Sequence, residues 1–486
     1  MTKTIESMSI SIATLTEEVA QLKGLLLQRD NSLAAKAAQL NGLTKIATPK
    51  KSERRKDYVD TTLRDTTPAP TPKERGNNGA KRKAYNVVEL ETICVEPDDE
   101  AFKTRREEAI FLFSRDVVRY KYIPPRLVKQ IYRCHKYRLG DDLYEGKAPI
   151  TPLQNSNFDS SIIANIIQQR FVYGLPVERI VKQYNEMGID MPKATAHGLL
   201  TKVGEMLDRL DPVLHQAILS DEYLHFDETY HTIIDKSKEG GSHKGYFWAA
   251  LSQRLGLMHI FISEGSRAKR VFTEYLPPSY RGAIQSDGYS SYKVVEGWDY
   301  PKAIRLGCVQ HCKRKFLEIA EQPEAKEVIG IYNEFYHIRH QHSKEQWIEL
   351  SAEVFERLEC RLRELERDKE NFVNAALSGA VAYSLNELEA VRNIISSTEY
   401  ELDNNAIERP MRYISTSRKN SMFAGSMRGA KRMALIYSLA ISCRLNGVNS
   451  FAYFCDVINR LAALPPNTSP ENLRDLLPDR WGQSDL

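Results

Sequence analysis

The sequence predicts a multidomain protein of the α plus α/β class, with an N-terminal coiled coil, a helical region, and an α/β core that a helical insertion interrupts. Three observations lead to this fold class. A heptad pattern fills the first 43 residues, helical periodicity dominates residues 86–220, and strand-like segments begin near Glu222 before a charged helical stretch. A chain of 486 residues suits about two to four domains.

The first segment, residues 1–43, carries apolar residues at alternating spacings of three and four: Ile5, Met8, Ile12, Leu15, Val19, Leu22 and Leu26, with Leu33, Leu40 and Leu43 in phase. Arg29 and Lys36 interrupt the seam. A strict period of 3.5 favours a coiled coil, so we expect this segment to join copies of the chain into a homo-oligomer. The alternative is a single amphipathic helix packed on its own protein.

Residues 44–85 read as a linker, because Pro, Gly, Thr and basic residues dominate KKSERRK and TTPAPTPKERGNNGAKRK. Residues 86–220 read as mainly helical. Ile162, Ile163, Ile166 and Ile167 share a helix face, a Gly-Leu-Pro break follows, a second helix covers Val177 to Met187, and a turn at Gly188 leads to a third helix near Ala194. This spacing suits a DNA-binding helix-turn-helix and equally any three-helix bundle.

Residues 221–317 change to a strand period. The strand-like runs are YLHFDETYHTIID, GYFWAALS, LMHIFISEG, GAIQSDGY and KAIRLGCVQ, with a helix at RAKRVFTEYL before the fourth. This order matches the first part of a ribonuclease H-like core. We expect a helical insertion at 318–400, the end of the core at 401–445 and a helical tail at 446–486.

Three acids occupy matching places in this plan. Asp227 lies in the first strand, Asp287 directly follows the fourth, and Glu408 opens the helix after the insertion. Clustered carboxylates repel one another and are stable together mainly around divalent cations, and hard oxygen ligands suit Mg²⁺. The alternative is coincidence, since the chain holds 64 Asp and Glu residues and Asp-Gly is a common turn.

A strip of positive charge follows Glu408. Between Arg409 and Arg432 the chain has seven Lys or Arg residues and no acid. An acid beside a surface suited to phosphates indicates a site that grips a polyanion and acts on it.

Four stretches resemble successive signature blocks of one known family. They are DETYH at Asp227, QSDGYSSY around Asp287, GCVQHCKRKF from Gly307, and LDNNAIERPMR with SRKNSMFAGS from Leu402. On these blocks the chain resembles transposases of the insertion sequence 66 family, which belong to the DDE superfamily and have a ribonuclease H-like core. The last block is the most specific, and the resemblance covers most of the chain.

The resemblance implies that Asp227, Asp287 and Glu408 form a catalytic triad that binds two Mg²⁺ ions, with Mn²⁺ as an alternative. It puts Cys308 and His311 on a Cys-x-x-His pair; from the residues alone we interpret them as supporting packing residues. Asn404 and Asn405 look like residues at the start of the Glu408 helix that support Glu408 by positioning it. The basic residues expected to hold DNA phosphates are Lys313, Arg314, Lys315, Arg409, Arg412, Arg418 and Lys419.

The chain departs from the family pattern in two places. Family members often carry a cysteine-rich zinc module before the helix-turn-helix, but here only Cys134 and His135 stand there, with Cys94 far upstream, so we expect no structural zinc. Pro410 follows Glu408 by two residues, and we expect it to remove a backbone hydrogen bond and bend the first turn of that helix.

The implied function is a DNA transposase that binds the terminal inverted repeats of an insertion sequence and catalyses DNA cleavage and strand transfer, with double-stranded DNA as end and target. The alternatives are a metal-dependent nuclease or resolvase without strand transfer, and an inactive DNA-binding derivative. Seven cysteines, no apolar signal peptide and no run of 18 apolar residues favour the cytoplasm, at the prokaryotic nucleoid, and argue against a membrane span.

Overall fold

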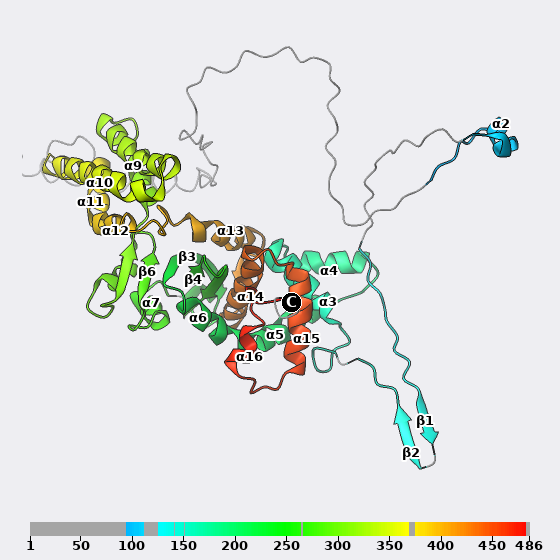
Figure 1. Ribbon diagram of the computed structural model, residues 1–486. Coiled ribbons are helices and arrows are strands. Elements are labelled where there is room, and N and C mark those ends of the chain that lie inside the picture. The colour runs from blue at the N-terminus through cyan, green and yellow to red at the C-terminus, as the bar shows by residue number, and fades with distance from the viewer. Residues whose placement is uncertain are drawn as a thin grey trace, which may run out of the picture. The chain divides into compact units, whose positions relative to one another are not determined.

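The computed structural model describes residues 94–110, 125–139, 141–149, 151–263, 266–368 and 375–482. The expected coiled coil (1–43) and linker (44–85) lie outside these residues and stay predictions. Residues 94–110 belong to a separate unit, where they form helix α2 (Glu100–Thr104) and a short 3₁₀ helix (Arg106–Glu108). Figure 1 shows the elements of the chain.

Two strands stand where the sequence predicted a mainly helical region. Strands β1 (Lys136–Leu139) and β2 (Asp142–Glu145) pair antiparallel, with Leu139 opposite Asp142. This register leaves two residues between the strands, the length of a short hairpin connection. The short polar and aromatic alternation on either side is a hairpin signal, so the expectation for 86–220 was wrong in this stretch.

The helices after the hairpin follow the predicted boundaries closely. They are α3 (Ser160–Ile167) with a π-helical turn (Gln168–Val172), α4 (Val177–Glu186), α5 (Lys193–Leu207) and α6 (Asp211–Leu219). Gly174 and Gly188 have φ of +71° and +93°, the left-handed conformation in which glycine commonly ends a helix. The predicted breaks at Gly-Leu-Pro and at Gly188 are therefore confirmed.

The central sheet is mixed, in the order β5-β4-β3-β6-β7. Its strands are β3 (Tyr223–Ile234), β4 (Ser242–Ser252), β5 (Leu257–Phe261), β6 (Gly282–Gln285) and β7 (Ala303–Leu306), and all five match predicted runs. The first three form an antiparallel meander, whereas β6 and β7 run parallel to β3. Helix α7 (Lys269–Tyr275) lies between β5 and β6 in the chain, α8 (Val309–Leu317) follows β7, and the short β8 (Phe423–Ala424) extends the pairing of β3.

The outer edge of β5 is covered by helix α14 (Met427–Leu445). The backbone N–H groups of Met258 and Ile260 donate to the hydroxyls of Ser442 and Ser438, at 2.9 and 2.7 Å. The two serines stand one helical turn apart, which matches alternate residues of the strand. Because these serines take up the edge donors, β5 is not a free template for another strand.

Helices α3 to α6 and the sheet share one hydrophobic core. Helix α3 packs on α15 (Ser450–Ala463), α5 packs on α14, and α6 packs on β5 (Figure 1). Fully buried residues of this core come from both sides of residue 220 and from the chain end: Ile166, Leu214, Phe226, Trp248, Tyr453 and Phe454. The helices from 160 to 219 and the tail from 446 are thus parts of the sheet's own domain rather than separate units.

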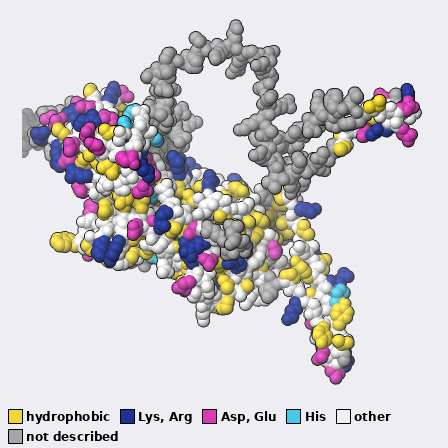
Figure 2. All heavy atoms as spheres, viewed as in Figure 1, with side chains coloured by type: hydrophobic (Ala, Val, Ile, Leu, Met, Phe, Trp, Pro, Cys, Tyr) yellow, Lys and Arg dark blue, Asp and Glu magenta, His cyan; other side chains and the backbone are white. Residues whose placement is uncertain are grey.

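The insertion is helical, as predicted. Its buried apolar residues form a second hydrophobic core, which also includes residues from the edge of the sheet. Its helices are α9 (Pro323–Gln341), α10 (Lys344–Arg367), α11 (Ala375–Asn386) and α12 (Leu388–Ile394). Figure 2 shows Lys, Arg, Asp and Glu intermixed on the outside of these helices, and pairs such as Arg361–Glu327 and Arg392–Glu359 account for several of them. Helix α13 (Asn405–Asn420) then returns the chain to the sheet.

Among the described helices, none is both long enough and apolar enough to cross a membrane.

Candidate active site

The structure brings Asp227, Asp287 and Glu408 together. Asp227 lies in β3, and β6 runs parallel beside β3 with His225 opposite Gln285. Asp227 follows His225 by two residues and Asp287 follows Gln285 by two, so the two aspartates lie at the same level of the sheet. Glu408 comes from α13, which packs on β3. Parallel neighbouring strands and one helix therefore gather three carboxyl groups that are far apart in the sequence.

Burial and the neighbouring acids raise the pKa of Asp227 well above its ordinary value. Burial has the largest effect, followed by the negative charges of Glu228, Asp287 and Glu408, while the Glu228 N–H, 2.8 Å from Asp227 Oδ1, works in the opposite direction. Carboxylates that are buried together and repel one another in this way form a cluster that a divalent cation would stabilise.

The residues fit the divalent cations that the sequence implies. All three ligands are carboxylates, the hard oxygen donors that Mg²⁺ accepts. Glu408 Oε1 is buried and has no hydrogen-bond partner among the described residues, which leaves it free to bind an ion. Asp287 Oδ1 accepts the N–H of Tyr289 at 3.0 Å, which fixes its orientation at the strand exit.

Glu228, next to Asp227, is an acid of a different kind that sequence reasoning left out. Its side chain is 2% exposed, and Arg267 and the Tyr292 hydroxyl both bond to it. Successive side chains of a strand point to opposite faces, so Glu228 faces away from its neighbour. The alternation of side chains along a strand could have predicted that Asp227 and Glu228 point to opposite faces of the sheet. That Arg267 and Tyr292 are the partners of Glu228 is seen only in the structure.

Asn404 fastens the start of α13 to β3. Its side chain donates to the Phe226 carbonyl at 2.8 Å and contacts His225 Nδ1 at 3.0 Å, while its backbone N–H donates to Cys308 Sγ at 3.3 Å. Asn404 and Asn405 do begin the helix, as expected. Asn404 is the N-cap residue, but its side chain makes no cap bond to the helix and bonds to β3 instead.

Pro410 lies inside α13, two residues after Glu408. Helix α13 begins at Asn405 and continues through Pro410 to Asn420. Pro410 is therefore the sixth helical residue, beyond the first turn, and the Glu408 N–H still bonds to the Asn404 carbonyl at 3.3 Å. Because Pro410 has no N–H, the Ala406 carbonyl in the first turn lacks its usual helical partner, as expected, while α13 continues as one helix through the proline.

Cys308 and His311 lie against Glu408. One ligand atom of each of the three residues lies within 4.8 Å of the others, and His311 Nδ1 is 3.7 Å from Glu408 Oε1. Burial raises the pKa of the Cys308 thiol. Cys308 is buried, as expected of a packing residue. The interpretation from the sequence did not include the proximity of Cys308 and His311 to Glu408.

The seven basic residues expected at DNA fall into distinct environments. Lys313 is 4% exposed, with its ammonium 5.3 Å from the Tyr336 ring centre, so it is no surface contact. Arg418 donates to the Tyr230 carbonyl at 2.6 Å and stacks on that ring, which joins α13 to β3. The remaining five are exposed: Arg314, Lys315, Arg409, Arg412 and Lys419.

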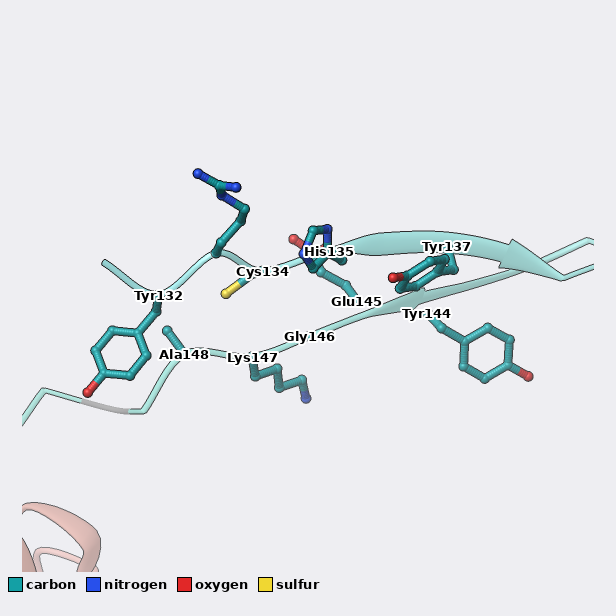
Figure 3. Close-up of a pocket in the computed structure, with 10 residues that line it drawn as sticks. Tyr132, Cys134, His135, Tyr137, Tyr144, Glu145, Gly146, Lys147 and Ala148 are labelled. Carbon is teal, nitrogen blue, oxygen red and sulfur yellow. The ribbon is translucent and has the colours of Figure 1, made fainter. Parts of the chain in front are cut away.

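A second cluster of polar and aromatic side chains lines a shallow pocket on the hairpin. Figure 3 shows Cys134 and His135 there, with Tyr132, Tyr137 and Tyr144 nearby. The Gly146 N–H bonds to the His135 carbonyl at 2.9 Å and continues the pairing of the two strands. Among the described residues, the ligand-type side chains of this pocket do not converge as Cys308, His311 and Glu408 do.

Comparison with known proteins identifies a family for this chain. Residues 155–432, more than half of the chain, match the family described as Transposase IS66 family. Three similar proteins come from Sinorhizobium fredii (strain NBRC 101917 / NGR234). "Uncharacterized protein y4jD" is 27% identical over 73% of this chain and 72% of its own length. "Uncharacterized protein y4qI" is 24% identical over 82% and 77%, and "Uncharacterized protein y4hP" is 26% identical over 81% and 74%.

Proposed function

Because the chain belongs to the Transposase IS66 family, we propose that it is a metal-dependent DNA transposase that binds the terminal inverted repeats of its insertion sequence and catalyses DNA cleavage and strand transfer. One observation carries the proposal: carboxyl groups from β3, from the exit of β6 and from α13 converge, and burial together with the neighbouring acids raises the pKa of Asp227. The strand order, an antiparallel meander beside two parallel strands, supports a ribonuclease H-like core.

In this mechanism Asp227, Asp287 and Glu408 would hold two Mg²⁺ ions. Bound there, Mg²⁺ would supply activation of the attacking hydroxyl group and stabilisation of the leaving oxygen in a displacement at phosphorus. Asn404 keeps the start of α13, and with it Glu408, beside the two aspartates. The chemistry needs no side chain as nucleophile, so no covalent link between protein and DNA is formed.

The exposed cations beside the site hold the DNA. Arg409 and Arg412 follow Glu408 on α13, and Arg314 and Lys315 follow His311 on α8. None of these four makes an ion pair with a described residue, so their charges are available to phosphates. Helices α3 to α5 and the linker bind the element ends, and residues 1–43 pair the copies of the chain.

The test is strand transfer with labelled DNA that carries the ends of the element. Asp227→Asn, Asp287→Asn and Glu408→Gln should each bind the ends but lose both cleavage and strand transfer with Mg²⁺, by about a hundredfold or more, because transition-state charge is no longer compensated. Glu401→Gln, which removes an exposed acid shortly before Glu408, is the matched control and should keep both activities.

Normal cleavage by Asp227→Asn would refute the assignment. Hydrolysis without joining in the wild type would identify a nuclease or resolvase instead. End binding without any cleavage, in the wild type and all variants, would identify a DNA-binding derivative.

A further inference from the structure

Two buried polar atoms beside the carboxylate cluster have no partner among the described residues. His311 Nδ1 and Glu408 Oε1 face each other at 3.7 Å, beyond hydrogen-bond distance, and both are shielded from solvent. Cys308 Sγ completes the group, with all three ligand atoms within 4.8 Å of one another. Unsatisfied buried polar atoms are uncommon in folded proteins, so this trio calls for a ligand that all three atoms can contact.

The backbone holds the three side chains in fixed positions. Cys308 is the N-cap residue of α8 and His311 is its third residue, so both lie on the first turn. Glu408 lies on the first turn of α13. Two hydrogen bonds join the segments that begin the helices: the Val309 N–H donates to the Leu402 carbonyl at 3.0 Å, and the Asn404 N–H donates to the Cys308 side-chain Sγ at 3.3 Å. Ligands on such joined elements are preorganised.

We propose that Cys308, His311 and Glu408 form a binding site for a thiophilic divalent cation such as Zn²⁺, distinct from the Mg²⁺ pair but sharing Glu408 with it. Sulfur, imidazole nitrogen and carboxylate oxygen are the three donor types that Zn²⁺ combines, whereas Mg²⁺ does not take sulfur. On binding, the thiol releases its proton to water. The Asn404 N–H and the N-terminus of α8 stabilise the resulting thiolate, and water completes the coordination.

Sharing Glu408 makes this site regulatory. A Zn²⁺ ion on the trio withdraws Glu408 from the Mg²⁺ ions, so Zn²⁺ should inhibit DNA cleavage in competition with Mg²⁺. This consequence rests on the proposed function, while binding of the ion does not.

Binding is tested on the full-length protein without DNA, using Co²⁺ as a spectroscopic substitute for Zn²⁺. The wild type should show a thiolate-to-Co²⁺ charge-transfer band that Zn²⁺ abolishes, and Cys308→Ser should lose it. His311→Gln keeps the thiol but should weaken Zn²⁺ binding about tenfold or more, as judged by competition with a chromophoric chelator. Cys360→Ser, which removes an exposed cysteine outside the trio, should leave the band unchanged. Circular dichroism verifies that each variant is folded.

A band that persists in folded Cys308→Ser, or a wild type without any cysteine-dependent band, would overturn the site. Inhibition is tested separately: each protein's own Mg²⁺-dependent cleavage is titrated with Zn²⁺, and the inhibiting concentration should rise about tenfold in Cys308→Ser. Equal inhibition of both proteins would overturn the shared role of Glu408. Because the Co²⁺ experiment needs no catalysis, its failure is distinguishable from failure of the transposase assignment.

Discussion

His231 on β3 shows how burial controls the protonation of a side chain. His231 is 2% exposed and stacks on Phe247 with 5.3 Å between the ring centres. Neither ring nitrogen makes a hydrogen bond with a described residue. Burial lowers the pKa of His231 from 6.5 to about 4, and the positive charges of Arg418 and Arg170 contribute in the same direction. The fold therefore requires this imidazole to be neutral.

The neutral His231 makes the stability of the fold depend on pH. Its folded pKa is below the unfolded value, so the unfolded chain binds the proton first as the pH falls. The contribution is complete above pH 6.5 and is lost between pH 6.5 and about 4. His231→Phe should reduce the slope of unfolding free energy against pH in this window by about 1.4 kcal/mol per unit, measured by urea unfolding. His342→Gln, at an exposed histidine, should keep the wild-type slope; an unchanged slope in His231→Phe would contradict the prediction.

At the scale of elements, the insertion is anchored to the sheet next to Asp287. Arg305 on β7 is buried and pairs with Glu387, which precedes α12, at 2.7 Å. Lys293 pairs with the same carboxylate at 2.8 Å. The Gly288 N–H donates to the Tyr383 hydroxyl at 3.2 Å, and a side chain at Gly288 would collide with Tyr383 and Glu387. Glycine follows Asp287 because the insertion approaches the backbone there.

This ion pair should be important for stability. Glu387→Gln removes a counter-charge of both Arg305 and Lys293, leaves Glu296 as the remaining partner of the buried Arg305 guanidinium, and should lower the free energy of unfolding by about 3 kcal/mol. Glu399→Gln breaks the exposed pair with Lys344, whose side chains are 75% and 71% exposed, and should cost less than about 1 kcal/mol. Urea unfolding of both variants decides the matter, and equal losses would show that the buried pair has no special role.

At the scale of the whole molecule, the shared core makes the domain built on the central sheet discontinuous in sequence. The α15 residues Tyr453, Phe454 and Val457 are fully buried, and α15 packs on α3, about 290 residues earlier. The insertion instead builds most of its own core. A region before the sheet and a region after it are therefore structural parts of one domain.

Truncation tests this arrangement. A chain that lacks residues 446–486 should be insoluble or lose cooperative thermal unfolding, because the apolar face of α3 would be exposed to water. A chain that begins at residue 151 should stay folded, since the described core starts with Leu153. Circular dichroism during heating distinguishes the two, and an unchanged melting temperature after removal of 446–486 would contradict the shared core.

Much of the fold and of the carboxylate site could be predicted from local patterns. The five strands, the helix breaks at Gly174 and Gly188, and the positions of Asp227, Asp287 and Glu408 follow from periodicity, turn residues and signature blocks within short windows. The hairpin at 136–145 was missed because its strands are only four residues long and lie within a stretch read as helical.

The sequence by itself determined the family, the order of the strands along the chain and the three candidate acids, because each of these is identified by a pattern within a short stretch of the sequence. Tertiary structure alone decided that Lys313 is buried, that Arg418 bonds to β3, that Glu228 is paired, and that Cys308 and His311 meet Glu408. The physical reason is distance along the chain. Burial, ion pairs and hydrogen bonds depend on distant residues; His225 and Asn404, for example, are separated by 179 residues and form their hydrogen bond only when the sheet and α13 come together.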